Sequence, residues 1–199
     1  MKIGVDFDNT IACYDQVFYE AARAQRLITD DVAISKGHVR DYLRADGRED
    51  VWTELQGLVY GKYISQAPPF PGVMEFFEAC RKGGIEINII SHKTRYPVIG
   101  EKLDLHEAAQ KWLAQQGFYD EKRTGLSKER VFFETTKAGK LQRIIDSGCE
   151  IFIDDLPEFL AEPVFPPGVK KVLFDPNGSY PDSADYLRLS SWAEIAKLI

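Results

Sequence analysis

Two carboxylates one residue apart, Asp6 and Asp8, follow a short apolar run near the start of the chain. If the strand continues through them, both side chains lie on one face and reach the same site. One carboxylate could then attack phosphorus to form an aspartyl phosphate, while the other protonates the leaving oxygen and later deprotonates water. Asn9 and Thr10 would turn the chain and offer backbone N–H groups to a phosphate. Considered alone, the segment is equally well a solvated acidic turn.

Polar residues of the same kind follow two later apolar runs. Ser91 ends the run 85–90, and Asp154 and Asp155 follow the run 150–153. In an open parallel sheet the carboxyl ends of the strands face the ligand crevice, so neighbouring strands would bring these groups to one edge. Clustered carboxylates need a cation, and hard oxygen ligands favour Mg²⁺. The sequence therefore predicts a magnesium site with the ligands Asp6, Asp8, Asp154 and Asp155.

Cationic side chains near these strand ends are candidates for holding phosphoryl oxygens. His92 follows Ser91 at the head of a short basic loop, although such loops are most often only solvated. Lys137 stands at the expected start of a helix, where the helix dipole does not favour a cation. Lys137 could be an ordinary surface lysine, or it could be the cation that balances the charge of Asp6 and phosphate. Lys140, one turn later, is the rival for that role.

Short β-type runs alternate with helical patterns along most of the chain. This order is typical of a mostly parallel sheet covered by helices on both faces. The sequence predicts an α/β, Rossmann-like fold with about five strands, at 2–5, 85–90, 130–133, 150–153 and 170–174. Helices are predicted over 72–82, 105–116 and 136–147, and a last helix begins with a capping box at Ser191.

The segment 14–71 interrupts this alternation because it shows helical patterns only, at 16–25 and 50–63 with a polar stretch between them. We expect this insert to form a small helical cap over the C-terminal edge of the sheet, although the same helices could pack on the sheet as ordinary layers. The predicted domains are an α/β core, 1–13 and 72–199, and a helical cap, 14–71.

Composition and charge disfavour several other kinds of protein. With 199 residues, 44% of them hydrophobic, the chain can bury one substantial core. A formal net charge of −6 makes nucleic acid an unexpected partner. No run approaches the ~20 apolar residues of a membrane span, and the N-terminus does not resemble a signal peptide. Cys13, Cys80 and Cys149 fit buried thiols in a reducing compartment, so we expect a cytoplasmic location.

In their types and order, these residues resemble the four signatures of the haloacid dehalogenase (HAD) superfamily, in its branch of aspartate-nucleophile phosphatases. The segment 3–10 is similar to an apolar strand followed by Asp-x-Asp-x-Thr, and 87–91 to an apolar strand that ends in Ser or Thr. Lys137, or less well Lys140, is similar to the lysine at a helix start, and 151–155 to the acidic pair. The insert between the first two signatures resembles the family's C1-type cap.

The resemblance implies a role for each matching residue. Asp6 would be the nucleophile and a metal ligand, and Asp8 the general acid and base with its backbone carbonyl on the metal. Asp154 would bind Mg²⁺ directly, and Asp155 would reach it through water or pair with the lysine. Ser91 and Lys137 would hold the phosphoryl oxygens. The full set of phosphate-contacting candidates is Thr10, Ser91, His92 and Lys137.

The leading hypothesis is a Mg²⁺-dependent phosphatase that hydrolyses a small phosphomonoester through an aspartyl phosphate. Two alternatives stay open: a phosphotransferase or mutase on the same scaffold, and a non-catalytic protein that binds a phosphorylated ligand. The partner would be a small phosphorylated metabolite, either a nucleoside monophosphate or a sugar phosphate. The cap would set specificity, and its polar or aromatic candidates are His38, Arg40, Tyr42, Arg44, Arg48, Tyr60, Lys62 and Tyr63.

Overall fold

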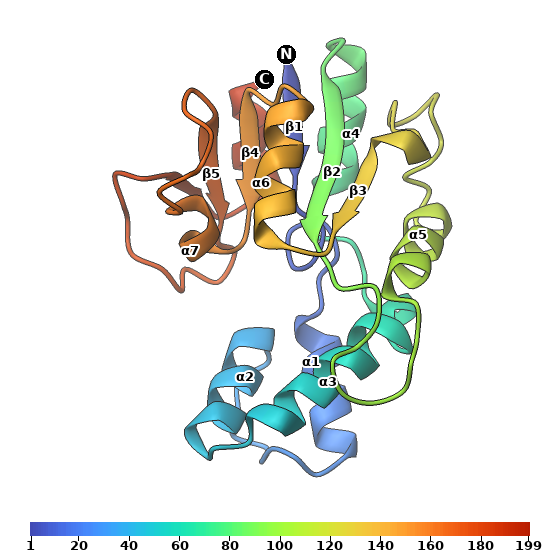
Figure 1. Cartoon of the computed structure of the whole chain (residues 1–199), viewed down its shortest axis with the longest axis vertical. Coiled ribbons are helices and arrows are strands. Elements are labelled where there is room, and N and C mark those ends of the chain that lie inside the picture. The colour runs from blue at the N-terminus through green and yellow to red at the C-terminus, as the bar shows by residue number, and fades with distance from the viewer.

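A parallel sheet of six strands organises the computed structural model, which describes all residues from 1 to 199 (Figure 1). The strand order is β3-β2-β1-β4-β5-β6, with every neighbouring pair parallel. The predicted α/β class is thus confirmed, and the strand count is corrected from about five to six. The strands are β1 Lys2–Val5, β2 Glu86–His92, β3 Val131–Glu134, β4 Ile151–Asp154, β5 Lys170–Phe174 and β6 Leu187–Leu189.

Two apolar layers cover the two faces of the sheet, because successive strand side chains point to opposite faces. Ile151 and Ile153 belong to the larger core, with α4 (Val73–Lys82), α5 (Leu105–Gln115) and α8 (Trp192–Ile195). Phe152, between them, belongs to a second cluster with α6 (Lys137–Asp146) and α7 (Pro157–Leu160). Short 3₁₀ turns complete the fold at Ile64–Gln66, Lys128–Arg130 and Ala196–Leu198.

Three helices form the insert after β1, beyond the C-terminal ends of the strands (Figure 1). They are α1 (Asp15–Ala24), α2 (Lys36–Ala45) and α3 (Glu49–Gly61). Helix α2 occupies the stretch that looked merely polar in sequence, because Ser35 caps it and Val39 and Leu43, one turn apart, are buried. We refer to α1–α3 as the cap; its division from the core at residues 14 and 71 stays a prediction.

The loop between β2 and α5 reaches the cap and packs on α3 (Figure 1). Two glycines one turn apart make the contact possible. A Cβ on Gly57 would lie 2.7 Å from the Cβ of Pro97, and one on Gly61 would lie 2.8 Å from the Cδ1 of Leu103. Glycine has a low helix propensity, but at these two positions of α3 the absence of a Cβ lets the loop approach the helix closely. None of the helices is both long and apolar enough to cross a membrane.

Candidate active site

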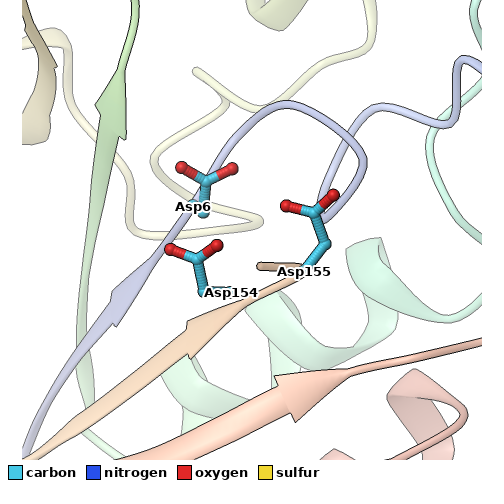
Figure 2. Close-up of side chains that lie close together, drawn as sticks. All are labelled: Asp6, Asp154 and Asp155. Atoms are coloured by element: carbon cyan, nitrogen blue, oxygen red, sulfur yellow. The ribbon is translucent and has the colours of Figure 1, made fainter. Parts of the chain in front are cut away.

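Three carboxylates meet where β1 and β4 end side by side (Figure 2). Val5 pairs with Ile153, so Asp6 and Asp154 follow as neighbours, and the Asp6 N–H donates to the carbonyl oxygen of Ile153 at 2.9 Å. One oxygen from each of Asp6, Asp154 and Asp155 lies within 4.8 Å of the others. We call these three residues the acid cluster. Asp6 and Asp154 are buried, so a compensating cation is required.

Lys140 supplies a protein cation to the acid cluster. Its Nζ lies 2.6 Å from Oδ1 of Asp6 and 2.6 Å from Oδ2 of Asp154. Burial alone would lower the pKa of Lys140, but Asp154 and Asp6 outweigh it and hold the pKa above its ordinary value. Burial raises the pKa of Asp154 to about 6, although Lys140 opposes the shift. Burial also raises the pKa of Asp155 well above its ordinary value. Added positive charge would favour ionisation of both carboxyls.

Lys137, the lysine favoured by the sequence pattern, lies outside the acid cluster. Thr136 caps α6 by accepting a hydrogen bond from the N–H of Gly139 at 3.0 Å, so Lys137 is the first helical residue. Its half-exposed side chain lies 3.6 Å from Glu162 in the loop after α7. Lys140, one turn further into the helix, is the lysine that reaches the carboxylates. The expected position of Lys137 at the acid cluster is therefore corrected, because Lys140 is the lysine that contacts Asp6 and Asp154.

Asp8 is held separately from the acid cluster. Lys93 donates to both of its carboxylate oxygens, at 2.9 and 2.8 Å, and the Tyr14 hydroxyl donates to Oδ1 at 2.8 Å. Burial, followed by the charge of Asp8, raises the pKa of Tyr14 well above its ordinary value, so the hydroxyl stays a donor. Sequence reasoning noted Lys93 only as part of a basic loop. The signal for its role was its position two residues after Ser91, at the end of β2.

The turn after Asp8 is tightly built. Asn9 has a φ of 61°, in the left-handed region that Asn tolerates better than most residues. Thr10 is fully buried, and Trp192 donates from Nε1 to its carbonyl oxygen at 3.2 Å. The Thr10 Oγ1 and Asn9 Oδ1 atoms have no hydrogen-bond partner in the protein. The Asn9 N–H, which was expected to face a phosphate, instead donates to the carbonyl oxygen of Ala12 at 2.9 Å.

A cavity of about 380 Å³ lies between the strand ends and helices α2 and α3. It brings together five of the predicted site residues. The wall includes Ser91, the next-to-last residue of β2, which is almost fully buried, and His92, the exposed last residue of the strand. Thr10 and Lys137 are not in the wall, and Asp154 lies beneath it beside Lys140. The predicted residues that line the cavity are Asp6, Asp8, Ser91, His92 and Asp155.

The acid cluster is suited to a magnesium ion. It offers three carboxylate oxygens close together, and oxygen donors with some coordination positions left for water or phosphate are what Mg²⁺ prefers. The side chain of Asp8 is not part of the cluster because Lys93 and Tyr14 hold it. Its predicted contribution, through the backbone carbonyl, stays a prediction.

Comparison with known proteins identifies the fold. No protein-family model matches the sequence, and no curated protein matches it. Among solved structures, a HAD family hydrolase from Deinococcus radiodurans R1 with bound phosphate and sodium has a TM-score of 0.58 at 17% identity, covering 99% of this chain and 94% of that one. The putative HAD-hydrolase YfnB from Bacillus subtilis, bound to magnesium, has a TM-score of 0.58 at 13% identity, covering 99% and 97%.

A third similar structure is a phosphoserine phosphohydrolase-like protein from Francisella tularensis subsp. tularensis SCHU S4. Its TM-score is 0.57 at 15% identity, and the match covers 100% of both chains. The fold is thus a parallel, Rossmann-like α/β sheet with an inserted helical segment. More particularly, it is the fold of the HAD-superfamily hydrolases, as the sequence signatures predicted.

Proposed function

We propose that the chain is a Mg²⁺-dependent phosphatase that hydrolyses a small phosphomonoester through an aspartyl phosphate on Asp6. The arrangement of Asp6 carries the proposal, because Lys140 holds one of its oxygens while its side chain faces the cavity. The bound phosphate of the Deinococcus structure and the bound magnesium of the Bacillus structure support it. The three free cysteines suit a cytoplasmic enzyme.

The first step joins the Asp6 carboxylate to phosphorus and breaks the bond to the leaving oxygen. Lys140 orients Asp6 through its Oδ1, so that the other oxygen can attack. Bound Mg²⁺ would neutralise charge on the phosphoryl oxygens and the acid cluster. Ser91 and His92, in the cavity wall, would contact the same oxygens. Positioning and electrostatic stabilisation are the main requirements of phosphoryl transfer.

Asp8 would move the proton in both half-reactions. It would protonate the leaving oxygen in the first step and accept a proton from water in the second, when water attacks phosphorus and frees Asp6. Lys93 and Tyr14 fix the direction of its carboxylate toward the cavity. Tyr14 and Lys93 are therefore proposed as positioning residues for Asp8.

Hydrolysis of p-nitrophenyl phosphate with and without Mg²⁺ tests the proposal. We expect Mg²⁺-dependent release of phosphate, and a loss of at least about 10³-fold in kcat for Asp6→Asn, which keeps the size of the side chain but removes the nucleophile. Lys137→Met is the matched control and should keep the activity, since Lys137 lies outside the site. Full activity in Asp6→Asn would refute the assignment of the nucleophile.

A further inference from the structure

The structure separates the polar cap residues that face the cavity from those that do not. Eight such residues were candidates from the sequence, and three of them line the cavity: Arg40, Arg44 and Tyr60. Lys36, which was not a candidate, joins them. The remaining five have no part in the cavity wall and are His38, Tyr42, Arg48, Lys62 and Tyr63.

Three of these cavity residues form a row along one face of α2. Lys36, Arg40 and Arg44 are spaced four residues apart, so they follow one another on the same side of the helix. Each step advances roughly 6 Å along the helix axis. Lys36 is nearest the acid cluster, with its Nζ 3.9 Å from Asp155. Arg40 and Arg44 therefore continue the row of cations away from the reacting centre.

Hydrogen bonds to two side chains, Ser35 and Asp15, hold the start of α2. Ser35 accepts a hydrogen bond from the N–H of His38 at 3.0 Å. Asp15 accepts one from the N–H of Lys36 at 2.9 Å, and Asn177, in the loop after β5, lies 3.4 Å from the same carboxylate. The start of α2 is thus tied to Asp15 of α1, and Asn177 of the core contacts the same carboxylate.

Arg40 and Arg44 are paired only with exposed carboxylates. Arg40 lies 2.8 Å from Asp41, which is 66% exposed, and Arg44 lies 2.7 Å from Glu49, which is 55% exposed. Neither carboxylate lines the cavity. An exposed pair with a single contact, such as Arg40–Asp41, contributes little to stability, so Arg40 can exchange its partner for a ligand at small cost. Arg44 holds Glu49 through two hydrogen bonds, at 2.7 and 2.8 Å, and a ligand anion would replace both with paired hydrogen bonds of the same kind.

The charges around the cavity favour an anionic ligand beyond one phosphate. The wall holds five cations, which are Lys36, Arg40, Arg44, Lys93 and Lys140. It holds four carboxylates, which are Asp6, Asp8, Asp155 and Glu158. Lys93 and Lys140 already pair with Asp8 and Asp6, and Lys36 faces Asp155. Among the carboxylates of the wall, Glu158 alone is left to face the two arginines, whose present partners, Asp41 and Glu49, lie outside the wall. Release of those partners would leave the arginine end of the cavity positively charged.

We infer that Arg40 and Arg44 form a second anion subsite, and that the substrate is a small phosphomonoester carrying another phosphate or a carboxylate. Guanidinium groups bind either anion with paired hydrogen bonds. The cavity volume of about 380 Å³ suits a small metabolite rather than a polymer. The inference rests on the proposed function for the phosphate that reacts at Asp6. Binding of the second anion by the two arginines can be measured without that reaction.

Matched substrate pairs test the subsite. Fructose 1,6-bisphosphate and fructose 6-phosphate differ by one phosphate, and 3-phosphoglycerate and glycerol 3-phosphate differ by one carboxylate in place of a neutral group. We expect a kcat/KM at least about 10-fold higher for the doubly anionic member of at least one pair, and the preferred pair identifies the second anion. Arg40→Gln/Arg44→Gln should lose this preference through KM, so that the two members of the preferred pair have kcat/KM values within about 2-fold of each other.

Two controls separate the subsite from other effects. Arg23→Gln removes an exposed cap arginine on α1 that is not in the cavity wall, so it should leave the preference intact. Calorimetric binding of the same pairs to Asp6→Asn measures the subsite without turnover. Equal binding within both pairs, or an equal loss for every compound in the double variant, would overturn the subsite. Absence of turnover with preserved binding preference would instead count against the proposed function.

Discussion

Replacing Lys140 by methionine would remove the protein cation from the acid cluster while keeping a long side chain in its place. The Nζ atom lies 2.6 Å from both Asp6 and Asp154, and all three side chains are at least 94% buried. Removing one member of a buried ion pair leaves the other charge without compensation, which costs about 3–5 kcal/mol. We therefore expect the free energy of unfolding of Lys140→Met, measured without metal, to fall by this amount.

The loss should depend on pH in a defined direction. Burial raises the pKa of Asp154 to about 6 while Lys140 opposes the rise, so the variant's Asp154 should titrate at still higher pH. A carboxyl with a raised pKa in the folded state binds protons on folding, and its destabilising effect disappears as pH falls through that pKa. The fall in the free energy of unfolding caused by Lys140→Met should thus be largest near pH 8 and smaller near pH 5.5.

Urea unfolding followed by circular dichroism measures both effects. Experiments at pH 8 with EDTA give the loss in the free energy of unfolding without metal. Added MgCl₂ should stabilise the variant relative to its metal-free form, because a ligand at 100 times its Kd stabilises the folded state by about 2.7 kcal/mol. Lys137→Met, three residues away and half exposed, is the control and should change stability by no more than about 0.5 kcal/mol. Equal stabilities of the two variants at pH 8 would refute the proposed charge balance.

Three further predictions concern the packing around the site. Gly4→Ala places a Cβ 2.5 Å from Cδ2 of Phe152 and should lower the free energy of unfolding by about 1–3 kcal/mol, visible as a lower Tm; an unchanged Tm would contradict the packing. Gly57→Val should displace Pro97 and its loop, which follows Ser91. The activation free energy calculated from kcat for p-nitrophenyl phosphate should therefore change more than the free energy of unfolding. An unaltered kcat would show that the loop does not position the site. Burial raises the pKa of the Cys80 thiol to about 12, so Ellman's reagent at pH 8 should modify it only in unfolded protein, and rapid labelling of folded protein would disprove this.

The sequence predicted positions well where a polar residue directly follows a short apolar run that forms a strand. Asp6, Ser91 and Asp154 each lie within one residue of the C-terminal end of an apolar strand. Parallel strands bring such ends to one edge whatever the details of packing. The missed strand, β6, has only three residues, Leu187–Leu189, at the edge of the sheet. A run this short has too little periodicity to be distinguished from a loop, and pairing with β5 defines it.

The sequence by itself determined the class of fold and the carboxylates at the strand ends, because both depend on local patterns that any parallel sheet converts into proximity. Only the tertiary structure decided which lysine serves Asp6. Lys137 and Lys140 are one turn apart on α6, so which of the two reaches Asp6 depends on how far that helix extends past the strands. The pairing of Lys93 with Asp8 likewise depends on contacts between distant parts of the chain, which no local pattern records.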